Sequence, residues 1–338
     1  MKRNDEDQPN FFAPAFADIP IRDQRDMMER PFFSLAKKPR KTPIEYEVSG
    51  TVVKVYPVKE FGIATIWDAD ILIWAATQVT EAVDRGGETN PRIHFHPYQL
   101  LRAIRRNTGG DQYKKLQDAL RRLASTYVET NIRVPKGSRK KTTGFHWLED
   151  WDAHEDEEGR PTGMSLTLPR WLYDGIIEKG MVLTIHEDYF TITGGIERWL
   201  YRVARKHAGH QESGWPFTMR QLYDKSGSAA RFSDFAIDVR KVVESDSLPE
   251  YALRLHKNGE GEEIYSVHVR TRKSTGESTL ISTAFRRCEV SGFSRGRSIV
   301  SMIRRSLLDN TDPRFELPRV RQRRMGRGVT QKAFRFVG

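Results

Sequence analysis

The stretch PYQLLRAIRRNTGGDQYKKLQDALRRLAS, residues 97–125, holds two amphipathic helical patterns separated by a pair of glycines. The first pattern begins with Pro97, which suits the first position of a helix, and places its leucine and isoleucine residues on one side. Gly109-Gly110 predicts a tight turn. The second pattern, which Asp111 can cap, runs to Ser125 and repeats apolar residues at spacings of 3, 4 and 3. These features predict a helix-turn-helix.

The segments on both sides of this pair complete a longer pattern. A helix that Asp68 or Asp70 can cap is expected to run to the Gly86-Gly87 stop. A short strand is expected at residues 92–95. After the second helix, residues 127–134 and 145–151 are strand-like and are joined by a basic tip. The order helix, strand, helix, turn, helix, hairpin is that of a winged helix-turn-helix.

The same order recurs about 120 residues later. A strand is expected at 164–168, a short helix at 169–179 and a strand at 184–191, before the repeated pattern begins. Three helices are then expected: one at 195–207, one that begins after Thr218 as its cap, and one at 231–244. A hairpin of residues 251–255 and 264–270 follows. The recurrence predicts a second unit of similar architecture.

The predicted fold class is α+β, with two tandem winged-helix (helix-turn-helix) domains. Residues 1–68 are expected to form an N-terminal arm with a short β-hairpin, because seven prolines interrupt any long helix there. The first winged-helix domain is expected at 69–160, the second at 161–285, and a basic C-terminal tail at 286–338. An acidic loop at Glu155–Gly159 is expected to be a solvated linker between the two domains.

The charge distribution indicates a polyanionic partner. The formal net charge is +11, and residues 286–338 contribute 14 basic and 4 acidic side chains. Residues 102–141 contain 12 basic and 3 acidic side chains, whereas residues 142–197 contain 3 basic and 12 acidic ones. Basic blocks separated by an acidic spacer favour double-stranded DNA as the partner, although solvated charged faces are the alternative explanation.

The candidate DNA contacts are polar or basic residues on the outer sides of the predicted helices and at the predicted wing tip. They are Arg105, Arg106, Lys114, Lys115, Arg121, Arg122, Lys136, Arg139, Lys140, Lys141, Arg205, Lys206, Arg220, Lys225, Ser228, Arg231, Ser233 and Lys241.

Composition and motifs also exclude several classes of protein. No run of about 18 apolar residues is present, which argues against a membrane span, and the N-terminus lacks an apolar signal region. The single cysteine, Cys288, cannot form an internal disulfide, which is typical of a cytoplasmic protein. No phosphate-binding loop of the G-x-x-x-x-G-K-[ST] type occurs. We therefore expect a cytoplasmic, non-enzymatic protein with no metal and no cofactor.

One motif supports an enzymatic alternative. His94 and His96 flank a phenylalanine on a predicted strand and would point to the same side, where they could hold a divalent ion. An HUH-type nicking enzyme uses such a pair with a tyrosine nucleophile, and Tyr98 and Tyr113 lie downstream. A third ligand is not evident in the sequence, so a structural role for the histidines is the competing interpretation.

Several stretches resemble the plasmid replication initiator protein A family. They are PFFSLAKKP at 31–39, GIATIWDADILI at 62–73, TGGDQY at 108–113, LTIHEDYF at 183–190 and ERWLYRVARKH at 197–207. The resemblance covers residues 31–251, and it implies a tandem winged-helix protein that binds repeated duplex sites at a plasmid origin.

The resemblance also implies partners and regulation. Monomers of such initiators bind the origin repeats, and dimers repress the initiator's own gene, with pairing through the first winged-helix domain. Because the chain has no motor motif, origin melting is expected to need the host replication initiator and helicase. A plain winged-helix transcriptional repressor is the remaining alternative.

Overall fold

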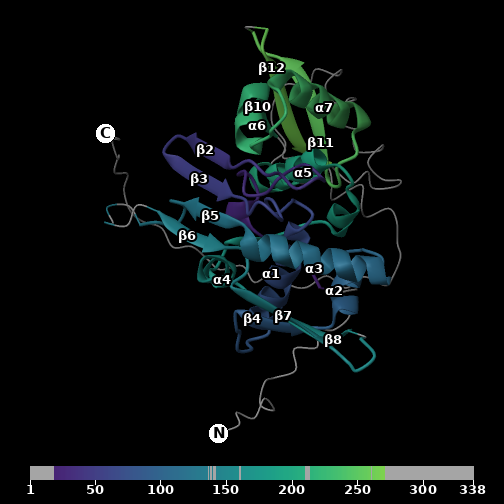
Figure 1. The fold of residues 1–338 in the computed structure, drawn as a ribbon. Helices are drawn as coiled ribbons and strands as arrows, with labels where there is room; N and C mark the ends of the chain where they lie inside the picture. Colours follow the sequence, from purple (N-terminus) through teal and green to yellow (C-terminus); the bar gives the residue numbers. More distant parts are fainter. Residues whose placement is uncertain are drawn as a thin grey trace, which may run out of the picture. The chain divides into compact units, whose positions relative to one another are not determined.

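A computed structural model describes residues 19–135, 137, 139, 142–159, 161–209, 214–259 and 261–270. These residues fall in one compact unit that ends at Arg272, and the predicted basic tail lies outside them. The elements, labelled as in Figure 1, are β1 Arg22–Gln24, η3 Arg25–Met27, β2 Ile44–Val48, β3 Thr51–Tyr56, α1 Ala69–Asp84, β4 Arg92–Phe95, α2 Pro97–Ala103, α3 Gly110–Ser125, β5 Tyr127–Thr130, β6 Thr143–His146, β7 Asp150–Glu155, β8 Pro161–Thr167, α4 Arg170–Ile177, β9 Val182–Thr184, η4 Glu187–Thr191, α5 Gly195–His207, β10 Trp215–Thr218, α6 Met219–Ser226, α7 Phe232–Ser245, β11 Tyr251–Lys257 and β12 Glu263–Val269. The α+β class is confirmed.

The second half of the unit follows the expected order of elements. α5, β10, α6, α7, β11 and β12 come in sequence, and the strands form an antiparallel sheet in the order β10-β12-β11. Figure 1 shows α6 and α7 beside this sheet. Thr218 caps α6 as predicted: the Gln221 N–H donates to its hydroxyl at 3.2 Å, and the Thr218 N–H donates to the Gln221 side chain at 2.9 Å.

The first half has the expected helices but a different strand pairing. β4 pairs with β8 in a sheet of order β4-β8-β7, whereas β5 and β6 extend a sheet of order β2-β3-β5-β6. The boundary expected at residue 160 therefore falls inside a sheet. The acidic segment Glu155–Gly159 is the turn of the β7–β8 hairpin and not a linker, because β8 returns to pair with both β7 and β4.

The described part of the expected N-terminal arm, residues 19–68, is integral to the packed unit. Met27, Met28, Phe32 and Phe33 are buried, and the β2–β3 hairpin pairs with β5. The prolines in this segment exclude a long helix, as expected, but they do not prevent the chain between them from burying apolar side chains. This segment is therefore not an appended arm.

The strand expected at 184–191 is also wrong. Only its first residue belongs to a strand, β9, and η4 covers 187–191. His186 precedes η4 and accepts a hydrogen bond from the Asp188 N–H at 3.1 Å, while Tyr189 and Phe190 are buried side by side. Adjacent buried rings suit a tight helical turn and contradict the alternation of a strand.

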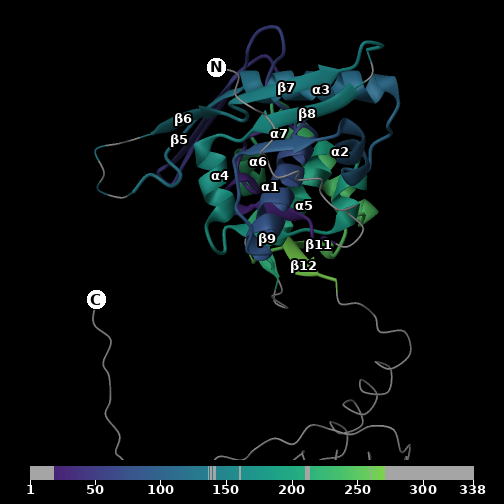
Figure 2. The same ribbon diagram turned by 90° about the horizontal axis from the view of Figure 1, so that it is seen from below.

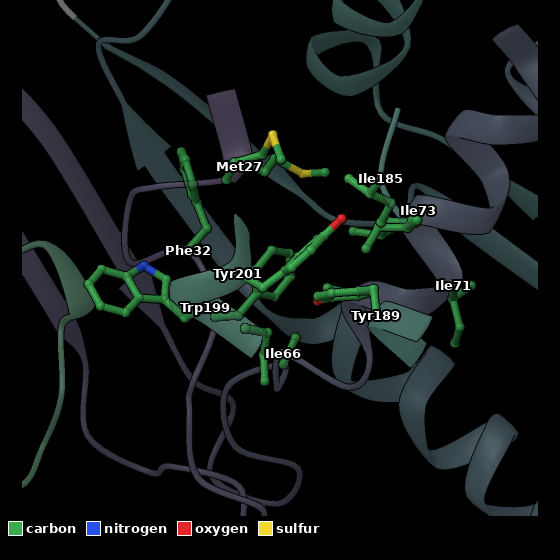
Figure 3. Close-up of a cluster of buried hydrophobic side chains, with 14 of the residues drawn as sticks. Met27, Phe32, Ile66, Ile71, Ile73, Ile185, Tyr189, Trp199 and Tyr201 are labelled. Atoms are coloured by element: carbon green, nitrogen blue, oxygen red, sulfur yellow. The ribbon is translucent and has the colours of Figure 1, made fainter. Parts of the chain in front are cut away.

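The two halves share one core. Figure 3 shows Trp199 and Tyr201 of α5 among side chains from the N-terminal segment and from α1. Tyr201 and Tyr189 are fully buried, with ring centroids 5.5 Å apart. Seen from below in Figure 2, α1 and α5 both lie within the body of the unit. None of the helices in the described ranges has the length and apolar character needed to cross a membrane.

Candidate nucleic-acid interface

Helix α7 has one buried side and one solvent side. Phe235, Ala236, Val239 and Val242 face the core, and the Phe235 ring lies 6.4 Å from the ring of Trp199. The solvent side carries Ser233, Asp234, Ile237, Asp238 and Lys241, with Arg231 at the N-cap position. Ile237 is 49% exposed, which is unusual for a large apolar side chain in the middle of a helix. This side offers hydrogen-bonding groups and one apolar surface to a ligand.

The turn between α6 and α7 is fixed in place by the N-terminal segment. Gly227 has φ of +59°, and a Cβ at this position would lie 2.4 Å from Cβ of Pro31. Arg40 donates a hydrogen bond from Nη1 to the carbonyl oxygen of Gly227 at 2.7 Å. Both the backbone conformation and the close approach require glycine here. The turn is thereby anchored to the N-terminal segment.

Two cations near this turn, Arg220 and Arg231, are exposed. The Arg220 guanidinium lies over the Phe232 ring, 4.1 Å from its centroid, which holds the start of α6 against the start of α7. Arg231 and Ser233 are exposed, whereas the half-buried Ser228 accepts a hydrogen bond from the Ala230 N–H at 3.2 Å. Lys241 is exposed and pairs with Asp238 on its own helix at 3.0 Å. Of the predicted contacts in this half, Arg220, Arg231 and Ser233 are thus placed together on one surface.

The β11–β12 hairpin adds exposed basic residues that are not among the predicted contacts. Arg254, His256 and Lys257 are exposed near the end of β11, and Leu255 between them is 40% exposed. Their signal was present in the sequence as a basic strand end before a glycine-containing turn. We name the solvent side of α7 together with Arg220, Arg231 and these hairpin residues the α7–hairpin surface.

Helix α3 presents the predicted amphipathic pattern. Leu116, Ala119, Leu120 and Leu123 are buried, while Lys114 and Lys115 are exposed. Arg121 is also exposed, but it pairs with Asp118 at 2.8 Å and lies 6.0 Å from the Trp151 ring centroid of β7. Of the four cations predicted on α3, Lys114 and Lys115 therefore have no ion-pair partner within the described residues.

Two predicted DNA contacts in the first half are structural instead. Arg122 forms two hydrogen bonds to the buried Asp68 carboxylate, each 2.8 Å long. Arg106 donates to Oδ2 of the fully buried Asp70 at 3.0 Å and to the carbonyl oxygen of Trp67 at 2.6 Å. These acids need cationic partners because an unpaired buried charge is costly. Arg106 and Arg122 are therefore removed from the candidate interface.

A comparison of Lys114 and Lys115 with Arg122 separates surface from structural cations on one helix. The double change Lys114→Ala and Lys115→Ala is expected to leave the free energy of unfolding within about 0.5 kcal/mol of the original. Arg122→Ala leaves the Asp68 carboxylate without its cation and is expected to cost about 3 kcal/mol. Urea unfolding measures both; equal losses would contradict the assignment.

Other predicted contacts have mixed outcomes. Arg105 is exposed and pairs with Glu187 at 2.6 Å and with Asp188 at 2.9 Å. Arg139 is exposed. Lys136, Lys140 and Lys141 of the predicted wing tip lie outside the described residues, as does Cys288.

Comparison with known proteins identifies the family. The model of the replication initiator protein A family matches residues 22–253, which is more than half of the chain. The chain belongs to the replication initiator protein A family. A curated protein of Wigglesworthia glossinidia brevipalpis, named "Putative replication protein", is 33% identical over 257 residues, covering 75% of this chain and 92% of that protein.

A solved structure resembles this initiator in fold. The crystal structure of domains 2 and 3 of RctB aligns with a TM-score of 0.52 at 15% identity, covering 73% of this chain and 98% of that one. At this identity the likeness concerns the fold alone.

The initiator's ERWLYRVARKH stretch forms α5, and its cations point into the unit. Arg198 donates to Oδ1 of Asp70 at 2.6 Å, and Arg202 is paired with Asp23 at 2.7 and 3.1 Å. Arg205 donates to the carbonyl oxygen of Thr184 at 2.5 Å. Arg205, which was predicted to touch DNA, therefore fastens α5 to β9.

Glu29 pairs with Lys206 and His207 of α5 and with Lys225 of α6. Its carboxylate accepts from Lys206 and Lys225 at 3.0 Å each, and it lies 2.5 Å from Nε2 of His207. Lys206 and Lys225 are partly buried, and both were predicted to contact DNA. Because Glu29 is almost fully buried, these lysines serve to compensate its charge and are not available as phosphate contacts.

The Glu29 cluster makes stability sensitive to acid. Burial alone would raise the pKa of Glu29, but the His207 hydrogen bond and the charges of Lys206 and Lys225 hold it below its usual 4.5. Its stabilisation is therefore present above pH 4.5 and is lost as the pH falls below that value. We expect Glu29→Gln to lower stability at pH 7 and to flatten the loss between about pH 5 and pH 3. Urea unfolding across this range tests it, and an unchanged acid dependence would contradict it.

The two histidines of the enzymatic alternative do not lie together on a strand. His94 is in β4, whereas His96 follows the strand at the N-cap of α2 and accepts a hydrogen bond from the Tyr98 N–H at 3.2 Å. Within the described residues, no three His, Cys, Asp or Glu side chains are grouped to hold a metal ion. His96 thus has a structural role as a helix cap.

Proposed function

We propose that this replication initiator binds repeated duplex DNA sites at a plasmid origin through winged-helix units. The observation that carries the proposal is the α7–hairpin surface. In this proposal α7 acts as the second helix of a helix-turn-helix, and the β11–β12 hairpin of the sheet β10-β12-β11 acts as its wing. The width of a DNA major groove admits such a helix, and the hairpin can reach the neighbouring backbone.

The chemistry of the α7–hairpin surface divides into two roles. Ser233, Asp234 and Ile237 on the solvent side can read base edges, since hydroxyl, carboxylate and apolar groups match different major-groove patterns. Arg231 at the N-cap of α7, and Arg254 and Lys257 on β11, are exposed and suit phosphate contacts. The acids on α7 lower general attraction to DNA, so binding at this surface depends on a matching sequence.

The first half supplies the other winged-helix unit of the proposal. α2, α3 and the β5–β6 hairpin keep the expected order, although the hairpin is built into a larger sheet. Lys114 and Lys115 offer phosphate contacts there. We assign this half a further role in homodimer formation, by which the protein represses its own gene, and we place origin melting with the host initiator and helicase.

Footprinting on the DNA that flanks the protein's own gene tests the proposal. Protection of regularly spaced repeats is expected, with a steep fall in affinity as salt increases. Uniform protection without repeats would contradict it.

A plasmid carrying that DNA should depend on the protein for maintenance, which a repressor alone would not provide. Because we propose no enzymatic activity, supercoiled origin DNA with Mg²⁺ should yield no covalent protein–DNA adduct; an adduct would favour the nicking enzyme.

A further inference from the structure

The sheet β2-β3-β5-β6 has a buried face and a solvent face. Ile44, Val53, Val55, Val128 and Phe145 alternate toward the core and are buried. Figure 1 shows these four strands side by side. The alternation places the intervening side chains, among them Lys54, Tyr56, Tyr127, Glu129 and His146, on the solvent face.

Three rings form a row across this solvent face. Tyr56 of β3 and Tyr127 of β5 are register partners with ring centroids 6.2 Å apart and an interplanar angle of 28°. Tyr127 and His146 of β6 are also partners, with centroids 5.3 Å apart. Tyr127 is 36% exposed and His146 is exposed as well. We name Tyr56, Tyr127 and His146 the ring row.

The hydroxyl end of the central ring lies over a glycine of the neighbouring strand. Gly144 of β6 has no side chain, and a Cβ there would lie 2.1 Å from Oη and 2.8 Å from Cζ of Tyr127. The phenol end of Tyr127 therefore covers the backbone of Gly144, while the side chain as a whole stays 36% exposed. Shielding of a strand glycine by a cross-strand ring explains why an aromatic side chain stands at Tyr127. It does not explain the aromatic side chains of Tyr56 and His146 beside it.

We infer that the ring row is a stacking platform for single-stranded nucleic acid, a site separate from the α7–hairpin surface. Rings that lie on the solvent face of an antiparallel sheet stack unpaired bases, and this stacking tolerates any sequence because every base has a π-face. The β5–β6 connection includes the exposed Arg139, which can contact a backbone phosphate. The inference rests on the protein's role in initiation, since unpaired strands form when an origin opens.

Binding of a fluorescent 20-nucleotide oligothymidine, followed by anisotropy, tests the platform. Tyr127→Leu is expected to weaken binding about 10-fold, and the added change Tyr56→Leu should weaken it further. Tyr127→Phe keeps the ring and should bind as the original protein does. Tyr98→Leu is the matched control, because Tyr98 is 51% exposed on α2, away from the sheet strands.

A second readout separates this site from duplex binding. Tyr127→Leu should leave binding of a repeat duplex unchanged, whereas Arg231→Ala should weaken duplex binding and leave oligothymidine binding unchanged. Thermal unfolding confirms that each variant is folded. The inference is overturned if Tyr127→Phe loses as much as Tyr127→Leu, if Tyr98→Leu loses as much, or if the original protein does not bind oligothymidine.

Discussion

Arg202→Ala is expected to lower the free energy of unfolding by about 3–5 kcal/mol. Arg202 is 1% exposed and Asp23 is fully buried, so the substitution leaves a carboxylate in the core without its cation. The Arg202 guanidinium also lies 5.9 Å from the centroid of the Phe33 ring, and that packing is removed too. Urea unfolding followed by circular dichroism measures the change.

Two further variants make this prediction specific. Arg231→Ala removes an exposed arginine and should change the free energy of unfolding by no more than about 0.5 kcal/mol. The double change Asp23→Leu with Arg202→Met replaces the pair with apolar groups and should recover much of the loss, because neither charge is then stranded. A single Arg202→Ala that unfolds like the original protein would show that the pair does not hold β1 against α5.

Replacing Arg231, Arg254 and Lys257 together with alanine is expected to weaken binding to the origin repeat by about 100-fold at about 50 mM salt. Log affinity falls linearly as log salt rises, and every phosphate that is no longer neutralised should make this slope less steep by about 1. The three side chains are exposed at the start of α7 and along β11, where the proposed docking geometry places the DNA backbone. Titration of repeat and scrambled duplexes across a salt series measures both quantities.

A control with the same reduction in charge isolates the surface. Lys59, Arg85 and Lys179 are exposed cations outside the α7–hairpin surface, and their combined replacement with alanine removes three charges as well. This control should reduce affinity only slightly, through the weaker overall field. Equal effects of the two triple variants would mean that the α7–hairpin surface does not dock on DNA and that attraction is spread over the molecule.

The local elements were predictable because they depend on neighbours in the chain. The spacing of apolar residues on α3 and α7, the capping pair of Thr218 and Gln221, and the Gly109-Gly110 break each lie within one turn or one helix of the sequence. The β11–β12 hairpin was also predictable, because its two strands are joined by a short turn. The α3 and α7 solvent sides, with Lys114 and Arg231, followed from the same periodicity.

The roles of the cations were not predictable in the same way. A basic residue on a helix has one sequence pattern whether water or a buried acid surrounds it. Glu29 and Lys206 are 177 residues apart in the chain, and Asp23 and Arg202 are 179 apart. Only the packed structure shows that these groups meet, and this is why the sequence alone predicts DNA contacts at Arg106, Arg122, Arg205, Lys206 and Lys225.

The amino-acid sequence alone was enough to establish the helices, most of the strands, the excess of positive charge and the family to which this initiator belongs. The tertiary structure decided that β4 pairs with β8, that the N-terminal segment is part of the core, and which arginines and lysines remain at the surface. Helix periodicity is a property of consecutive residues, whereas strand pairing and charge compensation depend on which distant segments the core brings together.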